Sequence, residues 1–146
     1  MLIKVYGSAI SGIVATTITI EVNVDKGINF LLVGLPDNAV KESQQRIASA
    51  LNFYGYKIPG KKIVINMAPA DLKKEGSILD LPLAIGVLKS SGQLNANTDG
   101  IIFLGELSLD GSLRRINGVL PILISARSQG YNKFILPKKN KKEASF

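Results

Sequence analysis

The 146-residue sequence contains no cysteine, no histidine and no tryptophan. The lack of cysteine excludes disulfides and thiolate zinc sites. The lack of histidine removes the side chain that most often serves as a general base or metal ligand near neutral pH. The acidic residues also show no EF-hand spacing that would bind a cation through oxygen ligands alone. We therefore expect no metal and no cofactor in this segment.

Long apolar runs are absent as well. No stretch reaches the length of a membrane span, and the N-terminus MLIKVYGSAISG lacks the basic and apolar regions of a signal peptide. The composition, 46% apolar and 20% charged, is that of an ordinary globular protein, and the length suffices for one hydrophobic core. We expect a soluble, cytoplasmic protein without membrane contact.

Acidic residues are scarce near the C-terminus. Residues 1–110 contain ten Lys/Arg and ten Asp/Glu, whereas residues 111–146, here called the basic end, contain eight Lys/Arg and the single acid Glu143. The whole net charge of +7 therefore lies in the basic end. Such asymmetry is typical of a polyanion-binding surface, and a solvated, partly disordered tail is the alternative. No aromatic residues interleave with the lysines, which argues against base stacking.

Periodicity predicts both strands and helices. The expected strands are residues 2–6, 14–24, 28–33, 63–65, 101–104 and 134–136, with a tight hairpin over 106–113. The second and third strands are expected to pair as a hairpin through Asp25-Lys26-Gly27. This order, with three helices between the strands, predicts an α+β domain in which helices pack against a mixed β-sheet.

The first expected helix begins at Asp37 and ends at Gly55, with Val40, Ile47, Leu51 and Tyr54 as its apolar stripe. The second covers residues 81–88 with Asp80 as its N-cap, and the third begins at an Asn117 cap and ends at Gly130.

A charged loop, residues 68–79, lies between an expected strand and an expected helix. This central loop contains Asp71, Lys73, Lys74 and Glu75. Loops held between buried elements often carry functional residues, and a rigid hinge is the alternative interpretation.

Four strings carry a family resemblance. They are VGLPDNAVKESQQRIASAL (33–51), NMAPADLKKEG (66–76), DLPLAIGVLKSSGQL (80–94) and GELSLDGSLRRINGVLP (105–121). In this order they resemble the N-terminal domain of the magnesium-chelatase-like AAA+ ATPases of the ComM/YifB type. The resemblance implies that residues 1–137 form this domain and that residues 138–146 are a basic linker toward an AAA+ module. It also implies that ATP and Mg bind in that module and that the full-length protein is a hexameric motor acting on branched DNA.

The strings KKEGSILDLPLA and GELSLDGSLRRINGVLPILISARSQGYNKFILPKKN are similar to the proteolytic domain of Lon-type proteases. That resemblance implies a left-handed βαβ crossover and aligns the serine nucleophile with Ile78 and its lysine base with Leu120. Neither side chain can attack a carbonyl or hold a proton, so the resemblance implies that no catalytic residue is present. Ser77 lies one residue away, without the activating lysine.

We expect a non-catalytic accessory domain that supports DNA binding or ring assembly of a branch-migration motor used in recombination and natural transformation. Two alternatives remain open: a protein-interaction module that uses the degenerate cleft around residues 71–80, and a hydrolase that uses Ser77. The candidate DNA-binding residues are Arg114, Arg115, Arg127, Lys138, Lys139, Lys141 and Lys142, with Lys73 and Lys74 as a second patch.

Overall fold

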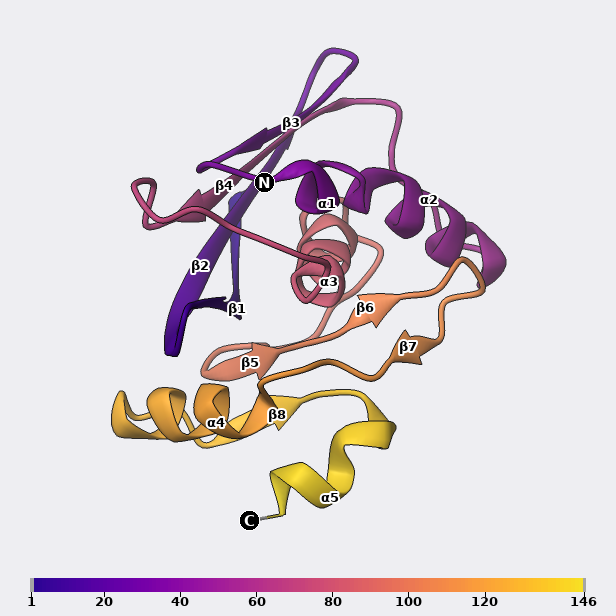
Figure 1. Cartoon of the computed structure of the whole chain (residues 1–146). Coiled ribbons are helices and arrows are strands. Elements are labelled where there is room, and N and C mark those ends of the chain that lie inside the picture. The colour runs from indigo at the N-terminus through magenta and orange to yellow at the C-terminus, as the bar shows by residue number, and fades with distance from the viewer. Residues whose placement is uncertain (1, 146) are drawn as a thin grey trace.

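A six-stranded mixed β-sheet forms the centre of the structure (Figure 1). The computed structural model describes residues 2–145. The strand order is β3-β4-β2-β1-β5-β8, and β6 and β7 form a separate hairpin. The strands are β1 (Leu2–Ser11), β2 (Val14–Asp25), β3 (Asn29–Val33), β4 (Lys62–Ala68), β5 (Ile101–Phe103), β6 (Glu106–Leu107), β7 (Leu113–Arg114) and β8 (Lys133–Ile135).

Helices cover both faces of this sheet, which confirms the predicted α+β class. They are α1 (Asn38–Lys41), α2 (Ser43–Phe53), α3 (Asp80–Ser90), α4 (Val119–Ser128) and α5 (Lys141–Ala144), the last preceded by a 3-10 turn, Lys138–Asn140. Within residues 2–145, no helix has both the length and the apolar character needed to cross a membrane.

The hairpin of β1 and β2 is the longest pairing in the sheet, antiparallel and in unbroken register. Alternation along β2 buries Ile18, Ile20 and Val22 completely, as the sequence pattern predicted. β1 runs past its predicted end because Gly7 leaves room for α3 above it. A Cβ on Gly7 would lie 2.8 Å from Leu79 Cδ2.

The predicted hairpin between the second and third strands is wrong. β4 lies between them, antiparallel to β2 and parallel to β3. The reason is burial: Ile63, Ile65 and Met67 of β4 are fully buried, so β4 takes the inner position. β3 exposes Leu31 and Val33 and is suited to the edge of the sheet.

Two of the three parallel crossovers in the sheet have opposite hands. β3, β4, β5 and β8 run in one direction, and the connections β3–β4 and β5–β8 both step the same way across the sheet. The first connection packs α2 with α3 over Ile18 and Ile20, whereas the second packs α4 on the other face, against Ile10. One of the two crossovers is therefore left-handed, as the Lon-type resemblance implied.

The first predicted helix is broken into α1 and α2 at Glu42. Asp37 caps α1, since its Oδ1 accepts a hydrogen bond of 2.8 Å from the Val40 N–H. Val40, Ile47 and Leu51 are buried as predicted. Tyr54 is not part of the stripe, because it follows the last turn and is 64% exposed.

Both other predicted caps are wrong. Leu79 occupies the N-cap position of α3, so Asp80 lies in the first turn and its carboxylate binds elsewhere. Gly118, not Asn117, precedes α4, with φ of 78°. A Cβ on Gly118 would lie 2.3 Å from Ile10 Cδ1, so only glycine brings the chain this close to β1.

The C-terminal segment packs on the domain as the 3-10 turn and α5. Asn140 is fully buried, and its side chain accepts a 3.0 Å hydrogen bond from the Ile116 N–H and donates a 2.8 Å bond to the Ile116 carbonyl. These bonds attach the 3-10 turn and α5 to the connection between β7 and α4. The division into a domain of residues 1–137 and a linker of residues 138–146 stays a prediction.

Candidate functional site

The central loop is attached to the segment before α1 by backbone and side-chain bonds. The Asp37 N–H donates to the Lys74 carbonyl (2.9 Å), and the Lys74 N–H donates to the Leu35 carbonyl (2.9 Å). Asp37 Oδ2 also accepts a 3.0 Å bond from the Gly76 N–H. Asp37 thus caps a helix and holds the loop at the same time, which links the strings 33–51 and 66–76.

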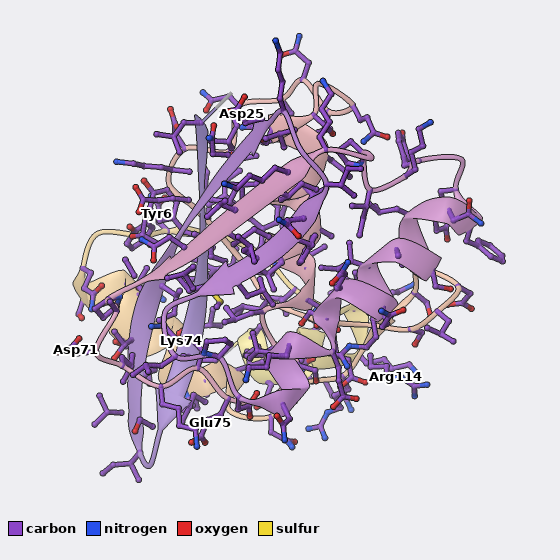
Figure 2. The ribbon with its side chains drawn as sticks, turned by 90° about the horizontal axis from the view of Figure 1, so that it is seen from above. Tyr6, Asp25, Asp71, Lys74, Glu75 and Arg114 are labelled. Carbon is purple, nitrogen blue, oxygen red and sulfur yellow. The ribbon has the colours of Figure 1, made fainter. Side chains whose placement is uncertain are left out.

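Lys74 is fully buried, and its Nζ donates a hydrogen bond to the Pro69 carbonyl. Figure 2 shows Lys74 within the fold, with Asp71 and Glu75 toward the outside. Burial lowers the pKa of the Lys74 ammonium below its usual value, and the Asp71 charge opposes that shift. The prediction of Lys74 as part of an exposed basic patch is therefore wrong. Lys73 is exposed but lies 4.0 Å from a Glu75 carboxylate oxygen.

Asp80 is the centre of a buried polar network that the sequence did not reveal. Its carboxylate accepts hydrogen bonds from Arg46 Nε (2.6 Å), Arg46 Nη2 (2.9 Å), Ser43 Oγ (2.8 Å) and the Leu107 N–H (3.0 Å). The bond to Asp80 raises the pKa of the Arg46 guanidinium, and burial opposes it. The network joins α2, α3 and β6, so we assign it to fold stability.

A cleft beside the central loop encloses about 290 Å³. Its polar residues are Glu75, Ser77, Glu106, Arg115 and Asn117. The Ser77 hydroxyl donates a hydrogen bond to the Glu106 carboxylate, which also lies 3.3 Å from Arg114 Nε. Glu106 was not a predicted site residue; nothing in the string GELSLDG indicates that the hairpin β6–β7 brings it opposite Ser77.

The two positions aligned with the Lon-type dyad do not share this cleft. Ile78 lines it and packs against the hydrophobic clusters on both faces of the sheet. Leu120, on α4, lines a different hollow together with Ile124 and Phe134. Ser77 therefore meets a carboxylate in this cleft, and no lysine lines it.

The basic end divides into paired and unpaired cations. Arg114 pairs with Glu106 at 3.3 Å, and Arg115 Nη2 lies 3.2 Å from Glu143 Oε1. The other predicted residues are exposed and have no ion-pair partner among residues 2–145: Arg127, Lys138, Lys139, Lys141 and Lys142. We call these five the free cations. They lie on α4, the 3-10 turn and α5, which the fold brings to one end of the molecule (Figure 1).

No group of three or more acidic side chains in the described part of the chain is placed to hold a metal ion. The polar cleft and the free cations are thus the two candidate sites.

Comparisons with known proteins agree with the fold and with the four sequence strings that carry the family resemblance. The model of the family described as subunit ChlI of Mg-chelatase matches residues 20–140. Competence protein ComM of Haemophilus influenzae is 46% identical over 143 residues, which is 97% of this chain and 28% of ComM. YifB of Escherichia coli is 45% identical over 141 residues, 95% of this chain and 28% of YifB.

A more distant match bears on the fold. Lon protease 2 of Bacillus subtilis is 27% identical over 100 residues, 68% of this chain and 18% of that protease. This likeness fits the mixed sheet and the crossovers of opposite hand. The chain spans only about 28% of the length of ComM and YifB. Because the family model covers most of the chain and the relatives share close to half of its residues, the chain belongs to the Mg-chelatase ChlI family, as a member of the ComM/YifB type.

Proposed function

We propose that this chain is a non-catalytic accessory domain of a ComM/YifB-type AAA+ ATPase and that it supplies a DNA-contacting surface. The observation that carries the proposal is the cluster of five free cations at one end of a fold in which residues 1–110 are balanced in charge. Such cations neutralise phosphates without reading sequence. The name of the relative ComM, a competence protein, supports a role in handling incoming DNA.

In the complete protein, ATP and Mg would bind in the AAA+ module, and hexamerisation through that module would place several copies of this surface around DNA. The motor would then move branched DNA during recombination and natural transformation. Support of ring assembly is the second contribution that we propose for the domain.

The absence of catalysis rests on Ile78 and Leu120, which offer neither nucleophile nor base. Ser77 remains the candidate for a surviving hydrolase, and the test is a fluorophosphonate probe on the wild type and on Ser77→Ala. We expect equal, background labelling of both, because a serine that donates to a carboxylate beside Arg114 lacks the lysine base of the Lon-type dyad. Labelling that depends on Ser77 would refute the non-catalytic assignment.

The test of DNA binding is the anisotropy of a labelled four-way junction over a salt series. We expect the quintuple variant R127A/K138A/K139A/K141A/K142A to lose most of its affinity and its salt dependence, whose slope falls by about 0.9 for each phosphate contact removed. The matched control removes five exposed lysines elsewhere, K4A/K26A/K57A/K61A/K62A, with the same change in net charge. Equal losses in both variants would show non-specific attraction and would overturn the proposal.

The second candidate function is a protein-interaction module in which the cleft of about 290 Å³ binds a peptide. Its carboxylates, Glu75 and Glu106, would favour a basic side chain. Salt dependence separates the two functions, and so does the variant Glu75→Gln, which would weaken peptide binding and leave DNA binding intact.

A further inference from the structure

A hollow surface lies between α4, β8 and α5, beside the free cations. It consists of two hollows of about 220 Å³ and about 550 Å³ that share Phe134 and Ala144. We call it the apolar groove. Its floor is apolar and comes from three elements: Leu120, Ile124, Phe134, Ile135, Leu136 and Ala144.

Three side chains of this groove are exposed although they are large and apolar. Ile124 is 62% exposed, Ile135 45% and Leu120 37%. Single exposed apolar residues are ordinary, but here two line the first hollow and one lines the adjoining second hollow, and together they mark a contact surface. Leu120 and Ile124 are one helical turn apart on α4, so both present their side chains to the same side of the helix.

The charged residues that line the groove are all cationic. Arg127 lines the first hollow, and Lys138 and Lys141 line the second, whereas no carboxylate among residues 2–145 lines either. Glu143, the single acid of the basic end, is held away from the groove. Its Oε1 lies 3.2 Å from Arg115 Nη2 and accepts a 3.1 Å bond from Asn140 Nδ2.

We propose that the apolar groove binds an acidic amphipathic segment of a partner protein. Two or three apolar side chains of the partner would fill the floor, and flanking Asp or Glu residues would pair with Arg127, Lys138 and Lys141. This recognition of a short segment by an apolar groove with complementary charge is a common mode of peptide binding. The inference goes beyond the proposed function and does not depend on it.

Two other classes of ligand, duplex DNA and a membrane surface, fit this groove less well. Duplex DNA would contact the cations through phosphates but would leave the apolar floor in water. A membrane surface also combines anionic charge with apolar burial, but it would not fill the smaller hollow of about 220 Å³ that Leu120, Ile124 and Phe134 line. The combination of hollow floor and cationic lining residues therefore favours a protein segment.

The test uses the 146-residue chain and a fluorescein-labelled synthetic peptide of about 18 residues, with Leu at helical i, i+3, i+4, i+7 spacing and Glu at the other positions. A second peptide carries Lys in place of Glu. We expect the Glu peptide to bind and the Lys peptide not to bind. We expect I124S/I135S and K138A/K141A each to weaken it about tenfold, as loss of anchoring contacts does.

The matched control is K139A/K142A, which removes the same charge from the same segment at positions that do not line the groove. It should change peptide affinity less than about twofold, since exposed charges outside a contact contribute little. Thermal melting checks that each variant is folded. Because all six substituted positions are exposed, we expect unchanged melting.

Three outcomes would overturn the proposal. The first is equal binding of the Glu and Lys peptides, or equal losses in the two lysine pairs. The second is loss of junction-DNA affinity in I124S/I135S, which would assign the groove to nucleic acid. The third is binding of phosphatidylserine vesicles that disappears in I124S/I135S, which would assign it to a membrane. DNA affinity that stays intact in I124S/I135S while peptide affinity falls separates this inference from the proposed DNA function.

Discussion

The charges that are hydrogen-bonded around the central loop and the free cations of the basic end lie in opposite environments. Beside the loop, Asp37 accepts two backbone N–H groups and Asp80 accepts four hydrogen bonds from Ser43, Arg46 and Leu107. At the basic end, the free cations face solvent with no ion pair within residues 2–145. A buried charge must be hydrogen-bonded or ion-paired inside the fold, and we call it a bound charge. An exposed charge is available to a ligand.

This difference shows which charges stabilise the fold. The strings that carry the family resemblance contain the bound charges, Asp37, Arg46 and Asp80, and these hold helices and loop together. The free cations, by contrast, take almost no part in internal bonding. Variants that disturb one region and leave the other intact test this separation.

The largest effect is expected for Asp80→Ala. It leaves Arg46 and the Leu107 N–H without their acceptor inside the fold, and breaking a buried ion pair costs about 3–5 kcal/mol of unfolding free energy. Urea denaturation measures it, with the exposed Asp99→Ala as control. Replacement of both partners, D80L/R46M, should cost less than Asp80→Ala alone. A loss below about 1 kcal/mol in Asp80→Ala would show that the network is dispensable.

The next largest effect is expected for Asn140→Ala. It leaves the N–H and carbonyl of Ile116 without their partner, at about 1–3 kcal/mol for an unsatisfied buried group. Because Asn140 attaches the 3-10 turn and α5, trypsin should also cleave after Lys138 to Lys142 faster than in the wild type. Asn132→Ala, exposed on the same end, is the control. Unchanged cleavage would contradict the attachment.

Lys74→Met tests the buried ammonium through pH. The folded state lowers the pKa of Lys74, so the unfolded chain holds the proton more tightly. Wild-type stability should therefore rise with pH as the pH approaches the usual lysine value from below, whereas Lys74→Met should lack this rise. Urea denaturation between neutral and alkaline pH measures the two slopes. Lys73→Met should keep the wild-type slope, and identical slopes in Lys74→Met would refute a buried charge.

The smallest effect is expected for Arg115→Ala. Its ion pair with Glu143 is exposed, and such pairs contribute about 0–1 kcal/mol. The variant should nonetheless release Glu143 toward the basic surface. A modest loss of junction-DNA affinity without a change in melting temperature is the expected result, and a large drop in stability would place Arg115 with the bound charges.

Much of the element pattern could be predicted from the sequence, because local periodicity decides it. The alternation of Ile18, Ile20 and Val22 predicted β2, and the spacing of Val40, Ile47 and Leu51 predicted a buried helical face. Pairing order could not be predicted, since the turn at Asp25-Lys26-Gly27 is compatible with either neighbour. The fully buried side chains of β4 decide it only once the sheet is assembled.

The candidate site was predictable in composition and less so in arrangement. Charge counting located the excess of cations in the basic end, but Lys74 looked identical to exposed Lys73 because burial has no signature in a single lysine. Sequence reasoning also missed four polar residues whose hydrogen-bond partners lie 24 to 37 residues away along the chain. They are Ser43, Arg46, Glu106 and Asn140.

The sequence by itself determined the family, the α+β class and the positive charge of residues 111–146. Each of these depends on residue identity or on spacing along the chain. Only the tertiary structure decided which charges are bound, which cations are free, and that α4, β8 and α5 enclose an apolar groove. Those properties depend on distances between segments far apart in sequence, and such distances exist only after the sheet has ordered its strands.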